Sequence, residues 1–394
     1  MALIIILHAF LILIGLAAFL WAFISVFNRI RLYSKFSEML SEKYNYEPKV
    51  SIIIPIRGVD EKLKENTHAL YDMDYPRNKY EILFVVDEDD EIYNALKKIT
   101  RKNKNVRILH SEVLPTCSGK NSAMITGVKH AKYDVIACID SDAKPSRIWL
   151  KSIVGPLSDK TIGVTTGYRF YVPSASFTSY LLSAWNNIGL RQMRGSYAFV
   201  WGGSFAIRKE TIKKLNIIKK WSRAISEDAI ITEAIRKTGM RIKFMPQCIT
   251  HSRMSYRFSH PLEFTTRQLT LVKLYDRKIW NIALLLYLFE RIMVILGIIL
   301  LYLFLTTSNP LFALESFLML WPIVFGLLKA SIEHRNLEKL IKGKTGSRLK
   351  YIIADFFAQW LMTYNLLRSW KKNTLRWRGR TYRIKLPYEI EVIE

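Results

Sequence analysis

The stretch that decides the fold is Tyr133-Asp134-Val135-Ile136-Ala137-Cys138-Ile139-Asp140-Ser141-Asp142. Its apolar, β-branched run stops abruptly at two carboxylates, as expected of a buried parallel strand whose carboxyl end faces a ligand crevice. Around the turn at Ser141 both acids can point to the same side, which suits a hard divalent cation carrying phosphate oxygens. The alternative is an Asp-rich turn that only caps its own backbone, because Asp-x-Asp alone is a weak signal.

The composition indicates a membrane protein with an anionic partner. The 394 residues are 50% hydrophobic, which is too apolar for an ordinary soluble protein, and their formal net charge is +26. Basic residues crowd next to apolar spans, so acidic lipid headgroups are favoured over nucleic acid, for which the sequence has no zinc pattern, aromatic RNA-binding signature or helix-turn-helix. The three scattered cysteines give no disulfide framework and fit a reducing compartment.

Residues 1–28 are predicted to form an N-terminal transmembrane anchor. Residues 2–27 are nearly all apolar, with His8 as the one clear polar interruption, and are long enough to span the ~30 Å hydrocarbon core. A signal peptide is the alternative, but no basic segment precedes the run and the run is too long. Arg29, Arg31 and Lys35 follow it, and the positive-inside rule then places the next domain on the cytoplasmic face.

Residues 48–278 are predicted to form an α/β domain with a mostly parallel sheet, because short β-branched runs alternate with helical patterns. Expected strands cover residues 50–55, 81–86 and 106–110, followed by the run before Asp140, and expected helices cover residues 61–71, 92–102 and 121–131. Acids follow two of these strands. Ligands of such sheets bind at that edge.

Residues 279–367 are predicted to return to the membrane. Residues 281–306 can span it, but Glu290 and Arg291 interrupt them, so either these charges pair within a bundle or the first part lies flat at the interface. Residues 311–328 form a second candidate span.

The segments that follow are more basic. Residues 332–350 are expected to be a basic loop. Residues 351–367 are apolar but short, and they fit an interfacial or re-entrant helix as well as a further span. Residues 368–394 form a basic tail that the positive-inside rule favours on the cytoplasmic side.

Four acidic or basic features follow one another in the α/β segment: Asp87, Gly119-Lys120-Asn121, Asp140-x-Asp142 and Glu227-Asp228. In this pattern the chain resembles the family-2 glycosyltransferases with the nucleotide-diphospho-sugar fold called GT-A, and within them the ceramide glucosyltransferase group. The resemblance covers nearly the whole chain. The closer match is carried by the motifs Pro55-Ile56-Arg57-Gly58-Val59-Asp60, Asp74-Tyr75-Pro76, Tyr80-Glu81-Ile82-Leu83, Ile225-Ser226-Glu227-Asp228, Gly239-Met240-Arg241 and Trp377-Arg378-Gly379-Arg380-Thr381-Tyr382-Arg383.

This resemblance implies a donor site for a UDP-sugar. Asp87 would accept a hydrogen bond from the nucleotide base, with Asp89 as a neighbour that shares the role. Lys120, at the amino end of a helix, would steady the diphosphate through its charge and the backbone N–H groups. A solvated acidic turn and an ordinary surface lysine are the respective alternatives.

The resemblance also implies Mg²⁺ or Mn²⁺ on the diphosphate, where it would neutralise the charge that builds up as UDP leaves. Asp142 is expected to be the first ligand, with Asp140 beside it. His251 is a further candidate metal or phosphate contact, and a structural histidine is its alternative.

Asp228, with Glu227 beside it, is the expected general base that deprotonates the acceptor hydroxyl. Its helix starts at these acids, so a helix N-cap is the alternative role. Gly202 and Gly203 resemble the small-residue turn that lets an acceptor come close to the sugar.

One motif departs from the family pattern. The family carries Gln/Arg-x-x-Arg-Trp on a helix after the base, and the matching place here is Arg267-Gln268-Leu269-Thr270-Leu271, without the second Arg and the Trp. Lys273, or the tail with Trp377 and Arg380 folding back, would have to supply the missing charge to the acceptor and diphosphate region.

The expected activity is therefore that of a membrane-bound, inverting hexosyltransferase of glycolipid biosynthesis. It would move a hexose, glucose in the ceramide group, from a UDP-sugar to a lipid hydroxyl by direct displacement, since no Ser-His or Cys-His pair competes. A polyprenyl-phosphate glycosyltransferase is the alternative enzyme. A non-catalytic membrane protein that binds nucleotide-sugar or lipid is the alternative from another class.

Overall fold

The computed structural model describes residues 2–58, 62–87, 90–101, 103–253, 261–343, 345–377, 379–386 and 389–393. The chain divides into two compact units. One, here called the catalytic unit, comprises Met39–Tyr171, Ile188–Arg277 and Ser369–Glu394, and the other, the helical unit, comprises Met1–Glu38, Val172–Asn187 and Lys278–Arg368.

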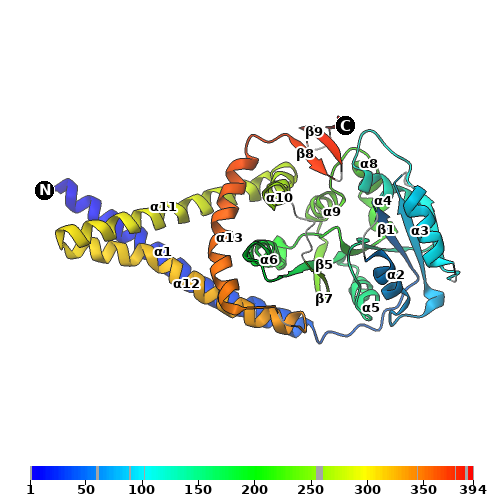
Figure 1. The fold of residues 1–394 in the computed structure, drawn as a ribbon, viewed down its shortest axis with the longest axis horizontal. Coiled ribbons are helices and arrows are strands. Elements are labelled where there is room, and N and C mark those ends of the chain that lie inside the picture. The colour runs from blue at the N-terminus through cyan, green and yellow to red at the C-terminus, as the bar shows by residue number, and fades with distance from the viewer. Residues whose placement is uncertain are drawn as a thin grey trace. The chain divides into compact units, whose positions relative to one another are not determined.

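The catalytic unit is organised around a seven-stranded sheet of order β3-β2-β1-β4-β6-β5-β7 (Figure 1). Its strands are β1 (Val50–Ile56), β2 (Tyr80–Val86), β3 (Val106–His110), β4 (Val135–Ile139), β5 (Ile162–Val172), β6 (Ser204–Arg208) and β7 (Arg241–Arg253). Strands β1 to β4 run parallel to one another, whereas β6 runs antiparallel to β4 and β5. Because β1 pairs in register with β2 and β4, the carboxyl ends of these strands meet at one edge.

Both faces of this sheet are buried, as a parallel sheet requires. Alternate residues of β1 separate into two apolar clusters, with Ile52 and Ile54 in one and Ile53 in the other. The first cluster includes residues of α2 (Leu63–Tyr71), α3 (Asp90–Thr100) and α5 (Trp149–Val154), and the second includes residues of α4 (Gly119–His130), α8 (Ile217–Trp221) and α9 (Glu227–Arg236). The predicted strands and helices of this segment are found within two or three residues of their expected bounds.

The basic tail predicted for residues 368–394 has a regular structure that the sequence did not predict. It forms a three-stranded antiparallel sheet of β8 (Thr374–Trp377), β9 (Arg380–Leu386) and β10 (Glu389–Val392). Apolar residues alternate with the basic ones, and Leu375, Tyr382 and Ile384 pack with Leu271 and Leu274 of α10 (Pro261–Tyr275). The tail is therefore part of the catalytic unit.

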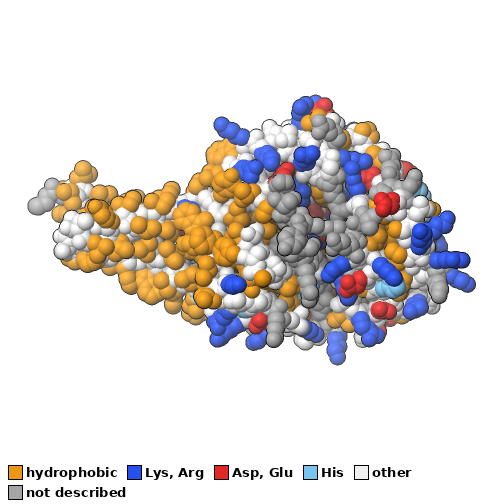
Figure 2. Space-filling view, viewed as in Figure 1, with side chains coloured by type: hydrophobic (Ala, Val, Ile, Leu, Met, Phe, Trp, Pro, Cys, Tyr) orange, Lys and Arg blue, Asp and Glu red, His pale blue; other side chains and the backbone are white. Residues whose placement is uncertain are grey.

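The helical unit contains three helices that are long and apolar enough to cross a membrane, by length and composition: α1 (Ala2–Met39), α11 (Arg277–Thr307) and α12 (Pro310–Leu340). Hydrophobic side chains cover the surface of these helices in Figure 2. The first helix continues past the predicted end at residue 27. Helix α13 (Arg348–Ser369) does not meet these criteria in the described chain.

Charges inside these helices are paired. The interruption in α11 is resolved by pairing, because buried Arg291 lies 3.0 Å from Glu290 and its guanidinium lies 4.6 Å from the ring centre of Trp360. His8 of α1 contacts the buried carboxylate of Glu315 at 2.6 Å. Such pairing limits the cost of charge in a membrane helix.

The prediction of a loop over residues 332–350 is wrong for its first half, since α12 continues to Leu340. Ala330, Leu337 and Leu340 are buried at helical spacing, and the buried Glu333 pairs with Arg29. The remaining short elements are α6 (Phe177–Leu190), α7 (Lys209–Lys214) and three 3₁₀ turns at Arg77–Lys79, Gly155–Ser158 and Gly195–Tyr197.

Candidate active site

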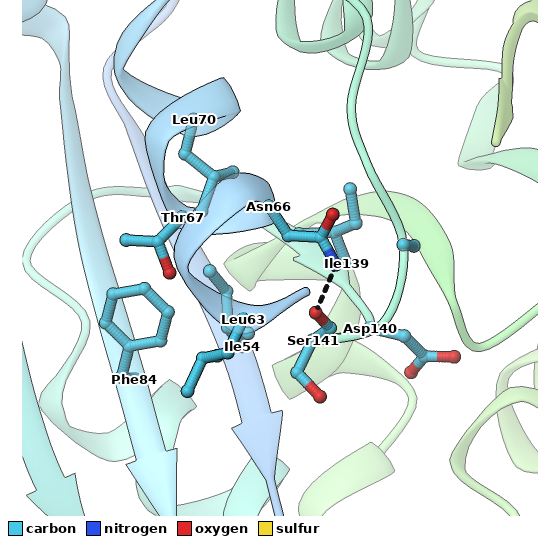
Figure 3. A pocket seen from close by; sticks show the side chains of 10 residues that line it. Ile54, Leu63, Asn66, Thr67, Leu70, Phe84, Ile139, Asp140 and Ser141 are labelled. Carbon is cyan, nitrogen blue, oxygen red and sulfur yellow. Dashed lines mark hydrogen bonds between the residues drawn. The ribbon is translucent and has the colours of Figure 1, made fainter. Parts of the chain in front are cut away.

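The acidic turn after β4 is fixed from the side of α2. The buried amide of Asn66 donates to the Ser141 carbonyl at 2.9 Å, and the Asp140 carboxylate points away from Asn66 (Figure 3). The Asp140 N–H donates to the Gly203 carbonyl at 3.2 Å, which ties the turn to the start of β6. The turn is therefore held by its backbone, so its carboxylates are left for other partners.

Asp140 and Asp142 converge on one guanidinium. Nη2 of Arg169, on β5, lies 3.1 Å from Asp140 Oδ2 and 2.6 Å from Asp142 Oδ1, and Nη1 lies 3.0 Å from Asp142 Oδ2. The Arg169 side chain is 13% exposed and lies over the ring of Trp201, with 5.2 Å between the guanidinium carbon and the ring centre. The two acids thus point to the same side, as their spacing predicted.

The carboxylate pair fits a hard divalent cation. Mg²⁺ is commonly held by one or two carboxylates and completed by phosphate oxygens and water. Among the described residues, no three His, Cys, Asp or Glu side chains form a ready metal-binding group, so the pair would need ligands from a bound phosphate. The backbone of His251 bridges to Lys144, close to the acidic turn, and its role as a ligand stays a prediction.

Lys120 lies at the centre of the acids. Its Nζ lies 2.8 Å from Asp140 Oδ1, 2.7 Å from Glu227 Oε1 and 3.2 Å from the Gly202 carbonyl oxygen. Burial alone lowers the pKa of Lys120, but the carboxylates of Asp140 and Glu227 outweigh it and raise that pKa well above its ordinary value. The side chain is only 16% exposed, so the alternative of an ordinary surface lysine is wrong.

Glu227 and Asp228 occupy different environments. Glu227 is buried, and burial raises its pKa to about 7 even though the Lys120 ammonium opposes this rise. Asp228 is partly exposed, and its carboxylate accepts from the Gly202 N–H at 2.8 Å, from the Ala229 N–H at 2.7 Å and from the Ser226 hydroxyl. The N-cap residue of α9 is Ser226 and not Asp228, so the alternative role of Asp228 as the helix N-cap is not what the structure shows.

Gly202 and Gly203 make room for carboxylates. A Cβ on Gly202 would lie 2.1 Å from Glu227 Oε1, and a Cβ on Gly203 would lie 2.6 Å from Asp140 Oδ2. Such distances are far inside van der Waals contact. The approach of an acceptor is therefore not needed to explain these glycines, because the close packing of the carboxylates explains them as well.

Asp87 lies at the end of β2 and is buried rather than part of a solvated turn. Its side chain is 4% exposed, and Oδ2 lies 3.1 Å from Arg380 Nη1 and 3.4 Å from Arg57 Nη1. The folded-back tail that was considered from the sequence thus reaches this carboxylate through Arg380. Asp89 lies outside the described residues.

Helix α10 holds the C-terminal sheet. The guanidinium of Arg267 lies 5.8 Å from the ring centre of Trp377 and 5.5 Å from that of Phe264. Lys273 donates to the carbonyls of Ser369, Trp370 and Lys372 at 2.8–2.9 Å. Lys273 therefore fixes the chain after α13, and it does not supply the charge missing from the Arg-Trp motif.

Comparisons with known proteins identify the family of the chain. The family model described as glycosyl transferase family 21 matches residues 9–389. The chain is 28% identical over 216 residues, 52% of its length and 50% of the relative's, to the probable glycosyltransferase YdaM of Bacillus subtilis (strain 168). It is 33% identical over 118 residues to the ceramide glucosyltransferase of Candida albicans (strain SC5314 / ATCC MYA-2876), covering 27% of this chain and 22% of that protein.

The chain thus spans about half the length of YdaM and less than a quarter of the Candida protein. Among solved structures, it is similar to the mannosyltransferase PcManGT from Pyrobaculum calidifontis in complex with GDP-Man and Mn²⁺. That similarity has a TM-score of 0.49 at 16% identity and covers 91% of this chain and 99% of the other.

The chain combines an α/β unit, which has acids at one sheet edge, with three helices that are long and apolar enough to cross a membrane. The chain belongs to glycosyltransferase family 21. The expected resemblance to the ceramide glucosyltransferase group is confirmed. The expected α/β fold class is confirmed by the mostly parallel sheet, and three helices are long and apolar enough to cross a membrane. The expected class of protein, a glycosyltransferase, is the class of this family.

Sequence analysis missed two arginines of this site, Arg169 and Arg57. Arg169 lies in the apolar run Tyr168-Arg169-Phe170-Tyr171, and Arg57 lies in a motif that was noted without a role. A charged residue within a buried strand needs an opposite charge or a ligand. That rule would have marked Arg169 as a partner of strand-end acids.

Proposed function

We propose that this enzyme transfers a hexose, with glucose as the first candidate, from a UDP-sugar to a hydroxyl of a membrane lipid, with inversion at the anomeric carbon. The observation that carries the proposal is the convergence of Asp140, Asp142, Lys120 and Glu227, with the partly exposed Asp228 on the same Gly202 turn. Membership of family 21 and the similarity to ceramide glucosyltransferases support it.

The base end of the donor is assigned to Asp87. A carboxylate at a strand end is a suitable acceptor for the N–H of uracil, and Arg57 and Arg380 beside it fix its orientation. Lys120 is assigned to the diphosphate, because it keeps its positive charge and lies within the first turn of α4.

The transfer step is assigned to Asp228. Its carboxylate takes the proton from the acceptor hydroxyl while the acceptor oxygen bonds to the anomeric carbon and the bond to the UDP oxygen breaks, so that UDP leaves with the electron pair. Buried Glu227 holds Lys120 and is assigned a positioning role. The N–H of Gly202 and the N–H of Ala229 keep the Asp228 carboxylate oriented.

Asp142 and Asp140 would hold a divalent cation, Mg²⁺ or Mn²⁺. When bound, that cation would neutralise negative charge on the diphosphate of the leaving group. His251 is proposed as a further contact of the metal or the phosphate. Acceptor contacts are proposed for Gly202, Gly203, Arg267 and Trp377, and Arg380 is proposed to contact the donor from its place beside Asp87.

A lipid acceptor is supported by the membrane-type helices and by relatives named ceramide glucosyltransferase. The proposed organisation is an anchor at residues 1–28, a catalytic domain at residues 48–278 completed by the tail, and a membrane region at residues 279–367. Arg29, Arg31 and Lys35 after the first helix favour the cytoplasmic face for the catalytic domain.

The test is UDP release by the full chain purified in detergent, with a panel of UDP-sugars, Mn²⁺ and mixed membrane lipids. We expect lipid-dependent release with one donor, and a loss of about 10²- to 10⁴-fold in Asp228→Asn, the effect of removing a general base. Binding of the nucleotide-sugar without release from any donor would contradict the proposal and favour a non-catalytic binding protein.

A further inference from the structure

Helix α10 leaves the diphosphate end of the site short of a cation. The position of the missing arginine is Thr270, whose side chain is fully buried and donates to the Thr266 carbonyl at 2.9 Å within its own helix. Lys273 is bound to three carbonyls, and Arg267 packs against Trp377. If the enzyme binds a nucleotide diphosphate, Lys120 of α4 meets it, and any second cation has to come from an element other than α10.

Arg169 of β5 is placed to be that cation. It enters from the sheet and contacts both acids of the turn, and it stacks on Trp201, which immediately precedes the Gly202 turn. A guanidinium keeps its charge at any physiological pH and presents a planar fork that matches two oxygens of a carboxylate or of a phosphate.

We propose that Arg169 is a diphosphate-binding residue that changes partner: it neutralises the Asp140–Asp142 pair when no donor is bound and turns to the phosphate oxygens when a divalent cation takes the pair. This inference rests on the proposed function. Arg169 contacts both carboxylate oxygens of Asp142 and Oδ2 of Asp140. A divalent cation held by these oxygens would repel the guanidinium, so the fork of Arg169 is released towards an arriving phosphate.

The charges of the site agree with such an exchange. Four carboxylates, of Asp140, Asp142, Glu227 and Asp228, lie with two cationic side chains, Lys120 and Arg169. A divalent cation and the diphosphate of a nucleotide-sugar bring equal and opposite charge. The balance therefore stays the same if Arg169 remains in the site and only its partner changes.

The experiment measures binding rather than turnover, with the full chain in detergent. Free Mn²⁺ is followed by electron paramagnetic resonance as Mn²⁺ alone is titrated, and UDP affinity is measured by calorimetry at saturating Mn²⁺. The variants are Arg169→Gln and Arg169→Lys. The matched control is Arg241→Gln, which removes an exposed arginine that pairs with Asp159 outside the site.

We expect Arg169→Gln to bind Mn²⁺ alone several-fold more tightly, because a competitor for the carboxylates is gone, and to bind UDP about tenfold more weakly, because a charge-assisted contact is lost. Arg169→Lys should keep the Mn²⁺ affinity of the wild type and recover part of the UDP affinity. Arg241→Gln should match the wild type in both titrations.

Weaker binding of Mn²⁺ and UDP together in Arg169→Gln would overturn the inference, because Arg169 would then only keep the two acids in place. Unchanged UDP affinity in that variant, with normal Mn²⁺ and UDP binding by the wild type, would overturn the inference and leave the proposed function standing. If the wild type binds no UDP at all, the UDP-sugar proposal fails together with the inference. If Arg169→Gln melts well below the wild type, the Arg169→Lys variant is the deciding measurement. A UDP affinity of Arg169→Lys equal to that of the wild type would exclude a bidentate contact between Arg169 and the phosphate and would overturn the inference.

Discussion

The two ends of the candidate donor site differ in how far apart their residues lie in the sequence. At the diphosphate end, Asp140 and Asp142 come from one turn, and their cations Lys120 and Arg169 come from the flanking α4 and β5. At the base end, Asp87 is held by Arg57 and by Arg380, which lies 293 positions later in the chain. The diphosphate end therefore depends on the sheet and the helices packed on it, whereas the base end depends on correct docking of the C-terminal strands.

The largest expected effect is at the diphosphate end. Asp142→Asn removes a charged cation ligand and leaves Arg169 with Asp140 alone, so transfer should fall about a thousandfold, equal to several kcal/mol of lost charge stabilisation. Transfer of labelled hexose to lipid measures it. Asp159→Asn, which removes an exposed carboxylate paired with Arg241, serves as the control and should be as active as the wild type. Activity of Asp142→Asn within tenfold of the wild type would argue against a metal at this turn.

The base end should respond more weakly and through binding. Arg380→Gln frees Asp87 on one side, so the KM for the donor should rise about tenfold with little change in kcat, as expected for the loss of one charged contact. Arg383→Gln is the control, because Arg383 lies on the same strand and pairs instead with the exposed Glu391. Equal KM values for the two variants would show that the C-terminal strands do not contribute to donor binding.

A pH dependence separates the buried acid from the exposed one. The pKa of Glu227 is raised from 4.5 to about 7, so the native state binds more protons than the unfolded state in that window and loses stability as pH rises through it. The melting temperature should therefore fall from pH 5 to pH 8, by about 2–4 °C for each kcal/mol in a domain of this size. Glu227→Gln cannot ionise and should flatten this dependence. An equal slope in both proteins would mean that Glu227 is already ionised at pH 5.

The smallest expected effect is at the support of the acidic turn. Asn66→Ala removes the hydrogen bond to the Ser141 carbonyl, whose net contribution is about 1 kcal/mol, so stability should fall by that amount and transfer by only a few-fold. Thermal melting and the lipid assay measure the two. A loss as large as that of Asp142→Asn would show that α2 positions the carboxylates far more tightly than one hydrogen bond implies.

The same comparison explains what the sequence could predict. The strand β4 and its two acids follow from a local pattern, an apolar run that ends in Asp-x-Asp, and the neighbouring strands were found within a few residues for the same reason. Lys120 and Glu227 were found because each begins a helix next to small or acidic residues. All of these depend on spacing within about a dozen residues.

The partners that come from elsewhere could not be predicted in this way. Nothing local to Arg169 shows that β5 lies on the far side of β6 from β4 and still brings its guanidinium to the turn after β4. The basic tail concealed strands because Leu375, Tyr382 and Ile384 alternate with Arg and Lys, and only packing on α10 shows which face is apolar. Sequence spacing thus identifies the acids and Lys120, and the fold identifies Arg57 and Arg169.

A crystal structure of the full chain with UDP and Mn²⁺, in which manganese is located by anomalous scattering, tests the central assignment most directly. We predict manganese between the carboxylates of Asp140 and Asp142, the uracil ring beside Asp87, and the Arg169 guanidinium on the diphosphate. Manganese or uracil bound away from these carboxylates would contradict the assignment of both ends of the site.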